Sequence, residues 1–198
     1  MIYDINEDYF KNHVATFTDY GNIKILDFKR PDTNHYRIRF LFDEDHYRLY
    51  ISGDLGELVA YNPNNMTYDD FEDFVHSPSY FESKILCHSR NIYEYDYDRT
   101  RQAVEERLLD VDFIPHYDFE TEEDLREEAV DSIMSDYRND KMGLGTAAYD
   151  ELLHYDPDGF EYFETLGRQW TGILNLYLLA FELAHKQIEE KNNGIQSN

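Results

Sequence analysis

The residues best placed to do chemistry are carboxylates that recur at helical spacing in the second half of the chain. Glu123, Glu127 and Asp131 lie four residues apart. Asp124 and Glu128 begin a neighbouring row. On a helix, residues four apart share a face and stand about 5–6 Å from each other. This distance is on the scale of successive phosphates along one nucleic-acid strand, so the pattern indicates a surface for a basic partner and is compatible with DNA mimicry.

Such a row has a cost for the helix that carries it. Like charges one turn apart destabilise a helix by about 0.2–0.5 kcal/mol per pair. Glu122 and Arg126 form the obvious compensating pair. A helix with a purely structural role would more often intersperse lysines, which favours a surface kept negative for a partner. The alternative is a solvated acidic face that only keeps the protein in solution.

A second acidic run follows, and aromatic residues are interleaved with it. Rings and acids together suit a protein interface, because the rings supply buried area and the acids steer the partner. The alternative is that these rings, Tyr149, Tyr155, Phe160, Tyr162 and Phe163, face the core. Within the run, the Asp-Pro-Asp-Gly sequence at 156–159 predicts a turn. The two acidic runs give these candidate partner-binding residues: Glu122, Glu123, Asp124, Glu127, Glu128, Asp131, Asp150, Glu151, Asp156, Asp158 and Glu161.

Signals for catalysis are weak. The sequence has no Gly-x-Ser-x-Gly, P-loop or Gly-x-Gly-x-x-Gly motif. Cys87 and His88 are neighbours in a predicted helix, where successive side chains point about 100° apart. That is poor geometry for a nucleophile and its base, so Cys87 is expected to be a small buried residue. We expect no enzyme; the alternative is an unrecognised site at His116 and Asp118.

Ligand motifs are equally sparse. The Gly-Leu-Gly-Thr sequence at 143–146 precedes a predicted helix and could cradle a phosphate, but it is more typical of a flexible connection. Neither 136–140 nor 156–159 has the alternating oxygen ligands and closing Glu of an EF-hand. There is no His-Glu-x-x-His motif. The sequence therefore predicts no dedicated metal site and no cofactor.

The elements that would position these residues differ between the two ends of the chain. Residues 36–42 alternate, with Tyr36, Ile38, Phe40 and Phe42 on one face. Period-2 patterning with short loops predicts an antiparallel sheet of three to four strands. The early segment is expected to contain a helix over 4–13 and strands over 23–28, 36–42, 47–52 and 58–61.

The rest of the chain predicts helices, over 67–76, 79–88, 98–110, 121–137, 147–153 and 168–191. The last is apolar around most of its circumference, as in a buried central helix. The fold class is therefore α+β: an N-terminal antiparallel sheet, then a mostly helical part with a long, largely buried C-terminal helix. We expect a meander subdomain over 1–66, a helical subdomain over 67–191 packed on it in one compact domain, and a flexible tail over 192–198.

Basic residues gather in the predicted sheet. With the strands as assigned, Lys24, Arg37, Arg39 and Arg48 share its outer face, near Tyr50. Three interpretations are open: they pair with the protein's own acidic helices, they bind an acidic patch on another subunit, or they form a nucleic-acid platform.

Charge and composition exclude several classes. The 198 residues include 42 Asp and Glu against 18 Lys and Arg, a formal net charge of −24. This disfavours direct binding to nucleic-acid backbones and to anionic membranes. With 18 tyrosines and 13 phenylalanines the chain is too aromatic for a disordered acidic tail. A single cysteine, and no basic or apolar leader, fit a cytoplasmic protein with no membrane span.

One segment carries a family likeness. Residues 47–58 read Tyr-Arg-Leu-Tyr-Ile-Ser-Gly-Asp-Leu-Gly-Glu-Leu. This resembles a pattern in small proteins of phages and prophages of Gram-positive bacteria, where a strand runs through a Gly-Asp-Leu-Gly-like turn into another strand. The resemblance covers residues 36–62. It implies a mobile-element origin and a counter-defence, anti-CRISPR-like role, and it assigns no functional residue.

Together these features predict a non-enzymatic inhibitor in the cytoplasm of a bacterial host. Its expected partner is a basic, nucleic-acid-binding defence protein, such as a CRISPR effector or similar nuclease, whose nucleic-acid channel is positively charged. The acidic surface would act by steric block or by DNA mimicry. The alternative is a structural or assembly protein of a phage that self-associates into a homo-oligomer.

Overall fold

The computed structural model describes residues 5–113 and 121–195, which form two compact units. The sheet unit comprises Ile2–Ile92 and Gly172–Asn198. The helical unit, Tyr93–Thr171, is inserted between these two segments. The units therefore do not divide at residue 66, where we expected the boundary, because the residues from 67 to 92 pack in the sheet unit.

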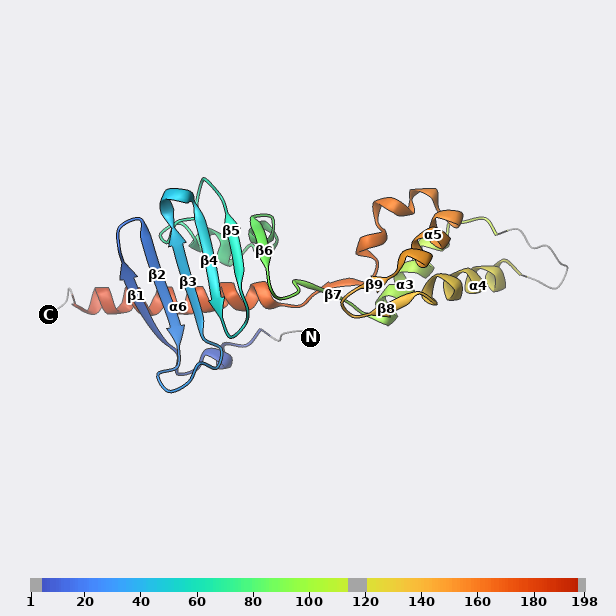
Figure 1. Ribbon diagram of the computed structural model, residues 1–198. Coiled ribbons are helices and arrows are strands. Elements are labelled where there is room, and N and C mark those ends of the chain that lie inside the picture. The colour runs from blue at the N-terminus through green and yellow to red at the C-terminus, as the bar shows by residue number, and fades with distance from the viewer. Residues whose placement is uncertain (1–4, 114–120, 196–198) are drawn as a thin grey trace. The chain divides into compact units, whose positions relative to one another are not determined.

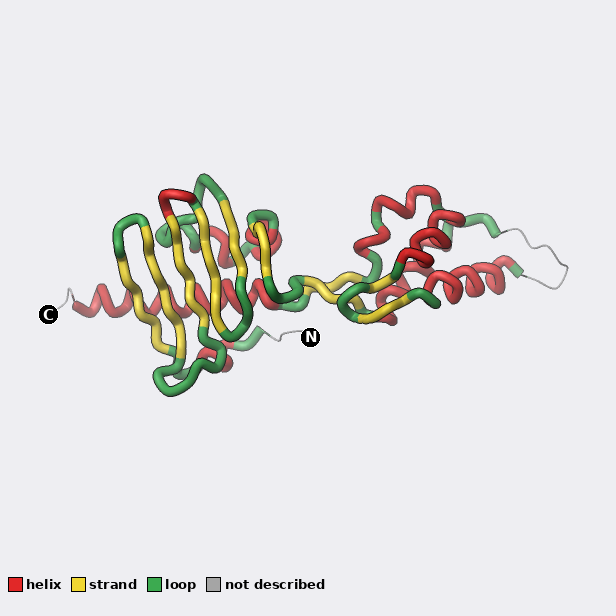
Figure 2. Tube along the Cα trace, in the orientation of Figure 1, coloured by secondary structure: helices red, strands yellow, loops and turns green. Residues whose placement is uncertain are grey.

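The sheet unit is built on a six-stranded antiparallel sheet in which each strand pairs with its neighbour in sequence (Figures 1 and 2). This confirms the α+β class with an N-terminal antiparallel sheet. One strand at each edge extends the sheet beyond the three or four strands expected. The strands are β1 (Val14–Asp19), β2 (Ile23–Lys29), β3 (Ile38–Asp43), β4 (Arg48–Gly53), β5 (Leu58–Tyr61) and β6 (Ile85–His88).

The turn between β4 and β5 requires a glycine. Gly53 has φ +150°, and a Cβ there would lie 2.0 Å from the carbonyl oxygen of Arg37, the residue just before the neighbouring strand β3. Asp54 then accepts a hydrogen bond from the backbone N–H of Tyr36 at 3.0 Å. The Gly-Asp-Leu-Gly segment thus has a structural role. Tyr36 itself has φ +56° and lies outside β3, so this strand begins later than its alternation predicted.

Helix α6 (Ile173–Ile195) covers one face of the sheet, as Figure 1 shows. The two short helices α1 (Glu72–Val75) and α2 (Pro78–Glu82) pack against the same helix. The ring of the fully buried Phe181 lies 4.7 Å from the ring of Phe71 and 5.6 Å from that of Phe40. The long C-terminal helix is largely buried, as predicted, but it lies at the centre of the sheet unit's core, whereas we expected it to organise the helical part of the chain.

Helix α6 is displaced along the sequence from its predicted bounds. It begins at Ile173, because Gly167 and Gly172 adopt φ +70° and +81° and a short strand lies between them. At its other end α6 continues past residue 191 to Ile195. Residues 192–195 are therefore helical, although we expected them in a tail.

The N-terminal half of the sheet unit also departs from prediction. The helix expected over 4–13 is one 3₁₀ turn, η1 (Glu7–Phe10), followed by β1. The helix expected over 67–76 is shortened to α1. The helix expected over 79–88 ends at Glu82, because the apolar residues after it pair with β5 as the strand β6.

The free edge of β1 is closed by side chains of α6. Gln187 accepts a hydrogen bond from the N–H of Ala15 at 3.0 Å and donates one to the carbonyl of His13 at 3.0 Å. Lys191 donates to the carbonyl of Ala15 at 2.9 Å. Exposed edge strands offer unpaired backbone groups to other chains, and these contacts satisfy three of them.

Over its described residues, 93–113 and 121–171, the helical unit combines three α-helices with two short antiparallel ribbons. Its helices surround a core of Val104, Leu108, Ala129, Val130, Ile133, Met134, Ala148, Leu152 and Leu166. Helix α4 ends before Tyr137, which pairs with Leu144 instead of extending the helix. The elements are β7 (Tyr93–Tyr95) with β10 (Arg168–Trp170), β8 (Tyr137–Asn139) with β9 (Gly143–Leu144), α3 (Tyr97–Leu108), α4 (Glu122–Met134), α5 (Thr146–Tyr155), η3 (Pro157–Glu161) and η4 (Phe163–Thr165).

Candidate acidic interface

Helix α4 buries one side and displays its carboxylates on the other. Ala129 and Ile133 are buried, as the predicted core stripe requires. Thr121 and Asp124 form a reciprocal capping box, with the Thr121 hydroxyl 3.1 Å from the Asp124 N–H. Hydrogen bonds from Thr121 hold the pKa of Asp124 below its ordinary value. All six candidate acids of this helix are exposed: Glu122, Glu123, Asp124, Glu127, Glu128 and Asp131.

Some of these charges have structural compensation. Arg126 Nη2 lies 2.6 Å from Glu122 Oε1, as predicted. Arg101 of α3, which sequence reasoning missed, lies 2.6 Å from Asp131 Oδ1 through its Nη1 atom. Acids in the first helical turn are also stabilised by the positive N-terminal end of the helix dipole. That leaves Glu127 and Glu128, which lie beyond the first turn and form no ion pair within residues 5–113 and 121–195.

The second acidic run has mixed roles. Asp156 caps η3 by accepting the N–H of Asp158 at 3.0 Å, and it also accepts a hydrogen bond from the Tyr162 hydroxyl. Glu151 is half-buried, whereas the remaining acids are exposed: Asp150, Asp158 and Glu161. Most of the interleaved rings pack against the core of the helical unit: Tyr155, Tyr162 and Phe163. Of the other two rings, Tyr149 is half-buried, and Phe160 has 57% of its surface exposed.

A groove between α4 and α5 brings together one acid from each run, Glu128 and Glu151. Its cavity volume is about 460 Å³, and its described lining residues are Val111, Asp112, Phe113, Leu125, Glu128, Ser132, Glu151, His154 and Tyr155. Sequence reasoning did not connect Asp112, Phe113 or His154 with the acidic surface. No spacing rule relates residues some 40 positions apart, so only the packing of α5 against α4 reveals this groove.

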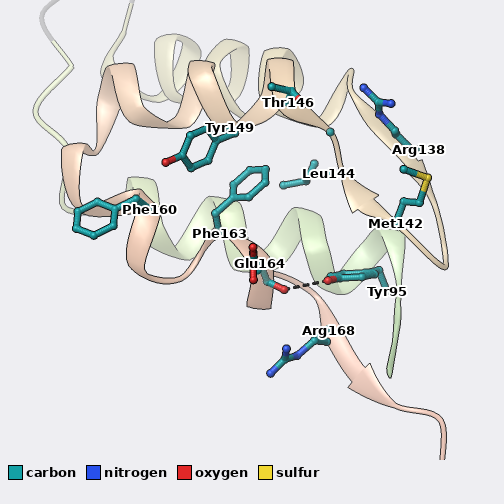
Figure 3. Close-up of a pocket in the computed structure, with 11 residues that line it drawn as sticks. Tyr95, Arg138, Met142, Leu144, Thr146, Tyr149, Phe160, Phe163, Glu164 and Arg168 are labelled. Atoms are coloured by element: carbon teal, nitrogen blue, oxygen red, sulfur yellow. Dashed lines mark hydrogen bonds between the residues drawn. The ribbon is translucent and has the colours of Figure 1, made fainter. Parts of the chain in front are cut away.

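A larger cavity, of about 590 Å³, lies elsewhere in the helical unit (Figure 3). The rings of Tyr149 and Phe163 meet edge to face there, with centroids 5.0 Å apart. Tyr95 donates its hydroxyl hydrogen bond to the backbone carbonyl of Glu164 at 3.0 Å, drawn as a dashed line in Figure 3. Among the described lining residues, Glu164 is the one carboxylate, and none is His or Cys.

On the sheet, Arg37 and Arg39 form ion pairs with a carboxylate of the same sheet. Arg39 makes a bidentate contact with Asp27, with its Nη2 atom 2.6 Å from Oδ2 and its Nε atom 2.9 Å from Oδ1. Arg37 Nη2 lies 3.6 Å from the same carboxylate. Arg48 lies opposite Asp43 in the β3–β4 register. Asp27 is a strand residue, so Arg37 and Arg39 pair within the sheet and not with the acidic helices that we considered.

Lys24 does not share this outer face, contrary to prediction. It pairs in register with Phe42, whose side chain points into the core, so Lys24 projects from the same inner face as Phe42 and not from the outer face that carries Arg39. Its Nζ atom lies 3.1 Å from Glu44 and 3.5 Å from Asp69. The alternation of β2 runs through Leu26 and Phe28, and our assignment of that strand was one residue out of phase.

Little supports a chemical role for the remaining candidate residues. Cys87 is exposed on edge strand β6 and not buried in a helix, as we had predicted. His116 and Asp118 lie outside the described residues. Across residues 5–113 and 121–195, no group of three or more His, Cys, Asp or Glu side chains is arranged to hold a metal ion. Within the same ranges, no helix has the length and apolar character to cross a bilayer.

Comparison with protein-family models, curated proteins and solved structures finds no match to this chain.

Proposed function

We propose that this chain is a non-enzymatic inhibitor from a phage or other mobile element. It binds a basic, nucleic-acid-binding host-defence protein, such as a CRISPR effector or similar nuclease, in the host cytoplasm. The acidic side of the helical unit is the binding surface, and it acts by steric block or DNA mimicry. The observation that carries this proposal is the pair Glu127 and Glu128, two exposed charges with no ion-pair partner in the described chain.

The charge distribution supports the choice of unit. Tyr93–Thr171 contains 23 acidic and 7 basic residues, a net charge of −16, which is two thirds of the charge of the whole chain. Five of the basic residues are engaged with carboxylates or aromatic rings of the same unit: Arg101, Arg107, Arg126, Arg138 and Arg168. A field of one sign over a surface steers an oppositely charged partner and raises its association rate.

A pull-down from bacterial lysate, eluted with a salt gradient, tests the proposal. We expect a basic nuclease or DNA-binding complex to be retained and then released by salt, because surface charges are screened within about 8 Å at physiological ionic strength. The variant Glu123→Lys/Glu127→Lys/Asp131→Lys should lose this capture while remaining folded. The matched control is Glu182→Lys/Glu189→Lys/Glu190→Lys, which reverses three exposed charges on α6. Equal capture by both variants and the native chain would refute the proposal.

A phage structural or assembly role is the second candidate, and one observation favours it. Ile25, Leu41, Tyr50 and Val59 lie side by side in register across four strands, on the sheet face opposite α6. A half-buried apolar row of this kind is suited to contact with another copy of the chain. A homo-oligomer that persists in high salt, with no basic partner retained, would favour this role.

A further inference from the structure

The groove between α4 and α5 has an apolar floor and an acidic rim. The rings of Phe113 and Tyr155 form the floor, with centroids 5.5 Å apart and planes inclined by 37°. Leu125 of α4 is half-buried beside them. Asp112 and Glu128 are exposed at the rim, and the half-buried Glu151 lines the same groove. Three carboxylates and two aromatic rings therefore line one groove.

Glu151 and Glu128 both influence the hydroxyl of Tyr155. The Tyr155 hydroxyl donates a hydrogen bond to Glu151 Oε1 at 3.3 Å. Burial raises the pKa of Tyr155, and the charges of Glu151 and Glu128 raise it further. No Lys or Arg is among the described lining residues, although His154 lies edge-on to Tyr155. The described lining of the groove therefore carries acidic side chains and no Lys or Arg.

A guanidinium already packs near this aromatic floor. The Cζ atom of Arg126 lies 5.7 Å from the centroid of Phe113, outside the described lining of the groove. Arg126 is held there by Glu122 and by the carbonyl of Leu108, which accepts from Nε at 3.1 Å. The same unit stacks Arg107 on Tyr162 at 4.0 Å. Arginine on an aromatic ring is thus a contact that this unit makes repeatedly.

We propose that this groove binds the guanidinium of an arginine side chain from the basic partner. The inference rests on the proposed function, because it names the group that enters one part of the same acidic surface. Arginine fits better than lysine: its planar cation stacks on rings and forms bidentate hydrogen bonds with carboxylates, whereas the ammonium group is compact and more strongly hydrated. Glu128 and Glu151 receive the charge, and Phe113 and Tyr155 contact the plane.

The first test compares two probes of equal charge. Hexa-arginine and hexa-lysine peptides, each labelled with a fluorophore, are titrated with the full chain at physiological salt and followed by anisotropy. A general negative surface binds the two alike, since both carry the same number of charges. We expect hexa-arginine to bind about tenfold more tightly, and equal affinities would overturn the groove as an arginine site.

The second test distinguishes binding in the groove from binding to the exposed carboxylates Glu123 and Glu127. Glu128→Gln/Glu151→Gln should reduce the preference for hexa-arginine to less than about twofold. Glu123→Gln/Glu127→Gln removes the same charge outside the groove and should weaken both peptides equally, keeping the preference. The control Glu189→Gln/Glu190→Gln on α6 should leave both affinities near those of the native chain. A preference that survives Glu128→Gln/Glu151→Gln contradicts the groove proposal.

The two proposals fail in different ways. In one outcome, Glu128→Gln/Glu151→Gln captures the lysate partner as the native chain does while Glu123→Lys/Glu127→Lys/Asp131→Lys does not. That result would support the acidic interface and refute the arginine groove. If neither variant affects capture, both proposals fall. Circular dichroism of each variant, expected to match the native spectrum, ensures that lost binding is not lost folding.

Discussion

The guanidinium of Arg101 on α3 reaches across to Asp131 on α4, with Nη1 2.6 Å from Oδ1. Its Nε atom lies 2.9 Å from Glu105 of its own helix. The third carboxylate of the acidic row is therefore partly neutralised by a residue thirty positions earlier in the chain. On α4, Glu127 and Glu128 therefore carry exposed charges without an ion pair among the described residues, whereas Asp131 does not.

Removal of this guanidinium should strengthen the acidic surface. In Arg101→Gln, Asp131 loses its counter-charge, and we expect tighter hexa-arginine binding, about twofold to fivefold, with a steeper salt dependence. Stability should change by less than about 1 kcal/mol, because both partners are partly exposed. Arg99→Gln is the control, since Arg99 Nη1 bonds to Gln169 and not to α4. An equal gain in both variants would mean that only net charge matters.

Loss of the α4 cap should loosen the start of that helix. Thr121→Ala removes the hydroxyl that accepts from the Asp124 N–H, and such a loss costs about 1 kcal/mol. Hydrogen exchange at the first-turn amides should accelerate, whereas Thr121→Ser should exchange like the native chain. Unchanged protection in Thr121→Ala would show that the cap does not stabilise this turn.

The capping box also gives a pH dependence with a definite sign. The folded-state pKa of Asp124 is lowered, first by the hydroxyl and then by the N–H of Thr121. Its contribution is therefore present above the unfolded pKa of about 3.9 and is lost as the pH falls through the lower folded value. The difference in exchange rate between Thr121→Ala and the native chain should be larger at pH 6 than in stronger acid, where only the bond from the Asp124 N–H to the hydroxyl is left to lose. A difference of equal size at both pH values would contradict this.

The contacts that close the β1 edge should matter for stability and for aggregation. Gln187→Leu leaves the N–H of Ala15 and the carbonyl of His13 without their partners, and we expect a loss of about 1–3 kcal/mol in urea unfolding. Light scattering should rise at high protein concentration, because the edge can then pair with other chains. Gln187→Glu keeps the acceptor and loses the donor, so its effect should be intermediate. Identical scattering by native chain and Gln187→Leu would argue against edge protection.

The buried imidazole of His13 should make the sheet unit sensitive to acid. Burial lowers the pKa of His13, and the charge of Arg30 lowers it further, against a hydrogen bond with the Tyr36 carbonyl at 3.2 Å. The unfolded chain therefore takes up this proton first, so stability falls as the pH drops from the unfolded value of about 6.5 toward the lower folded value. His13→Gln should lack this part of the slope between pH 7.5 and 5.5 in urea unfolding. Equal slopes of the unfolding free energy against pH in His13→Gln and the native chain would refute the role of His13.

The central strands could be predicted because one of their faces is buried. In β3, Ile38, Phe40 and Phe42 alternate with polar or half-exposed residues. This period-2 alternation indicates the buried face whatever loops flank the strand. The edge strands gave weaker signals. In β1 only Ala15 is buried, and β6 has no alternation that distinguishes a strand from a helix.

The acidic row was predictable in position but not in its partners. Glu123 and Glu127 are exposed because Ala129 and Ile133, on the other side of the helix, are buried in the core. Helical periodicity cannot show that Arg101 would meet Asp131, since that contact depends on how α3 packs beside α4. The phase error at Lys24 has a similar origin, because a strand that carries apolar residues on both faces does not reveal which face is inside.

The insertion of the helical unit has a consequence for how the chain folds. Strand β6 and helix α6 belong to one core, yet 79 residues, Tyr93–Thr171, separate their segments. An unfolded segment of that length would oppose the docking of α6 by a closure entropy on the order of 4 kcal/mol. In the folded insert, Tyr93 pairs with Trp170, so its two ends are held together and most of that entropy is already lost. The helical unit thus acts as an intramolecular clip, and because α6 follows it in the chain, α6 can complete the core of the sheet unit only after the insert has been synthesised.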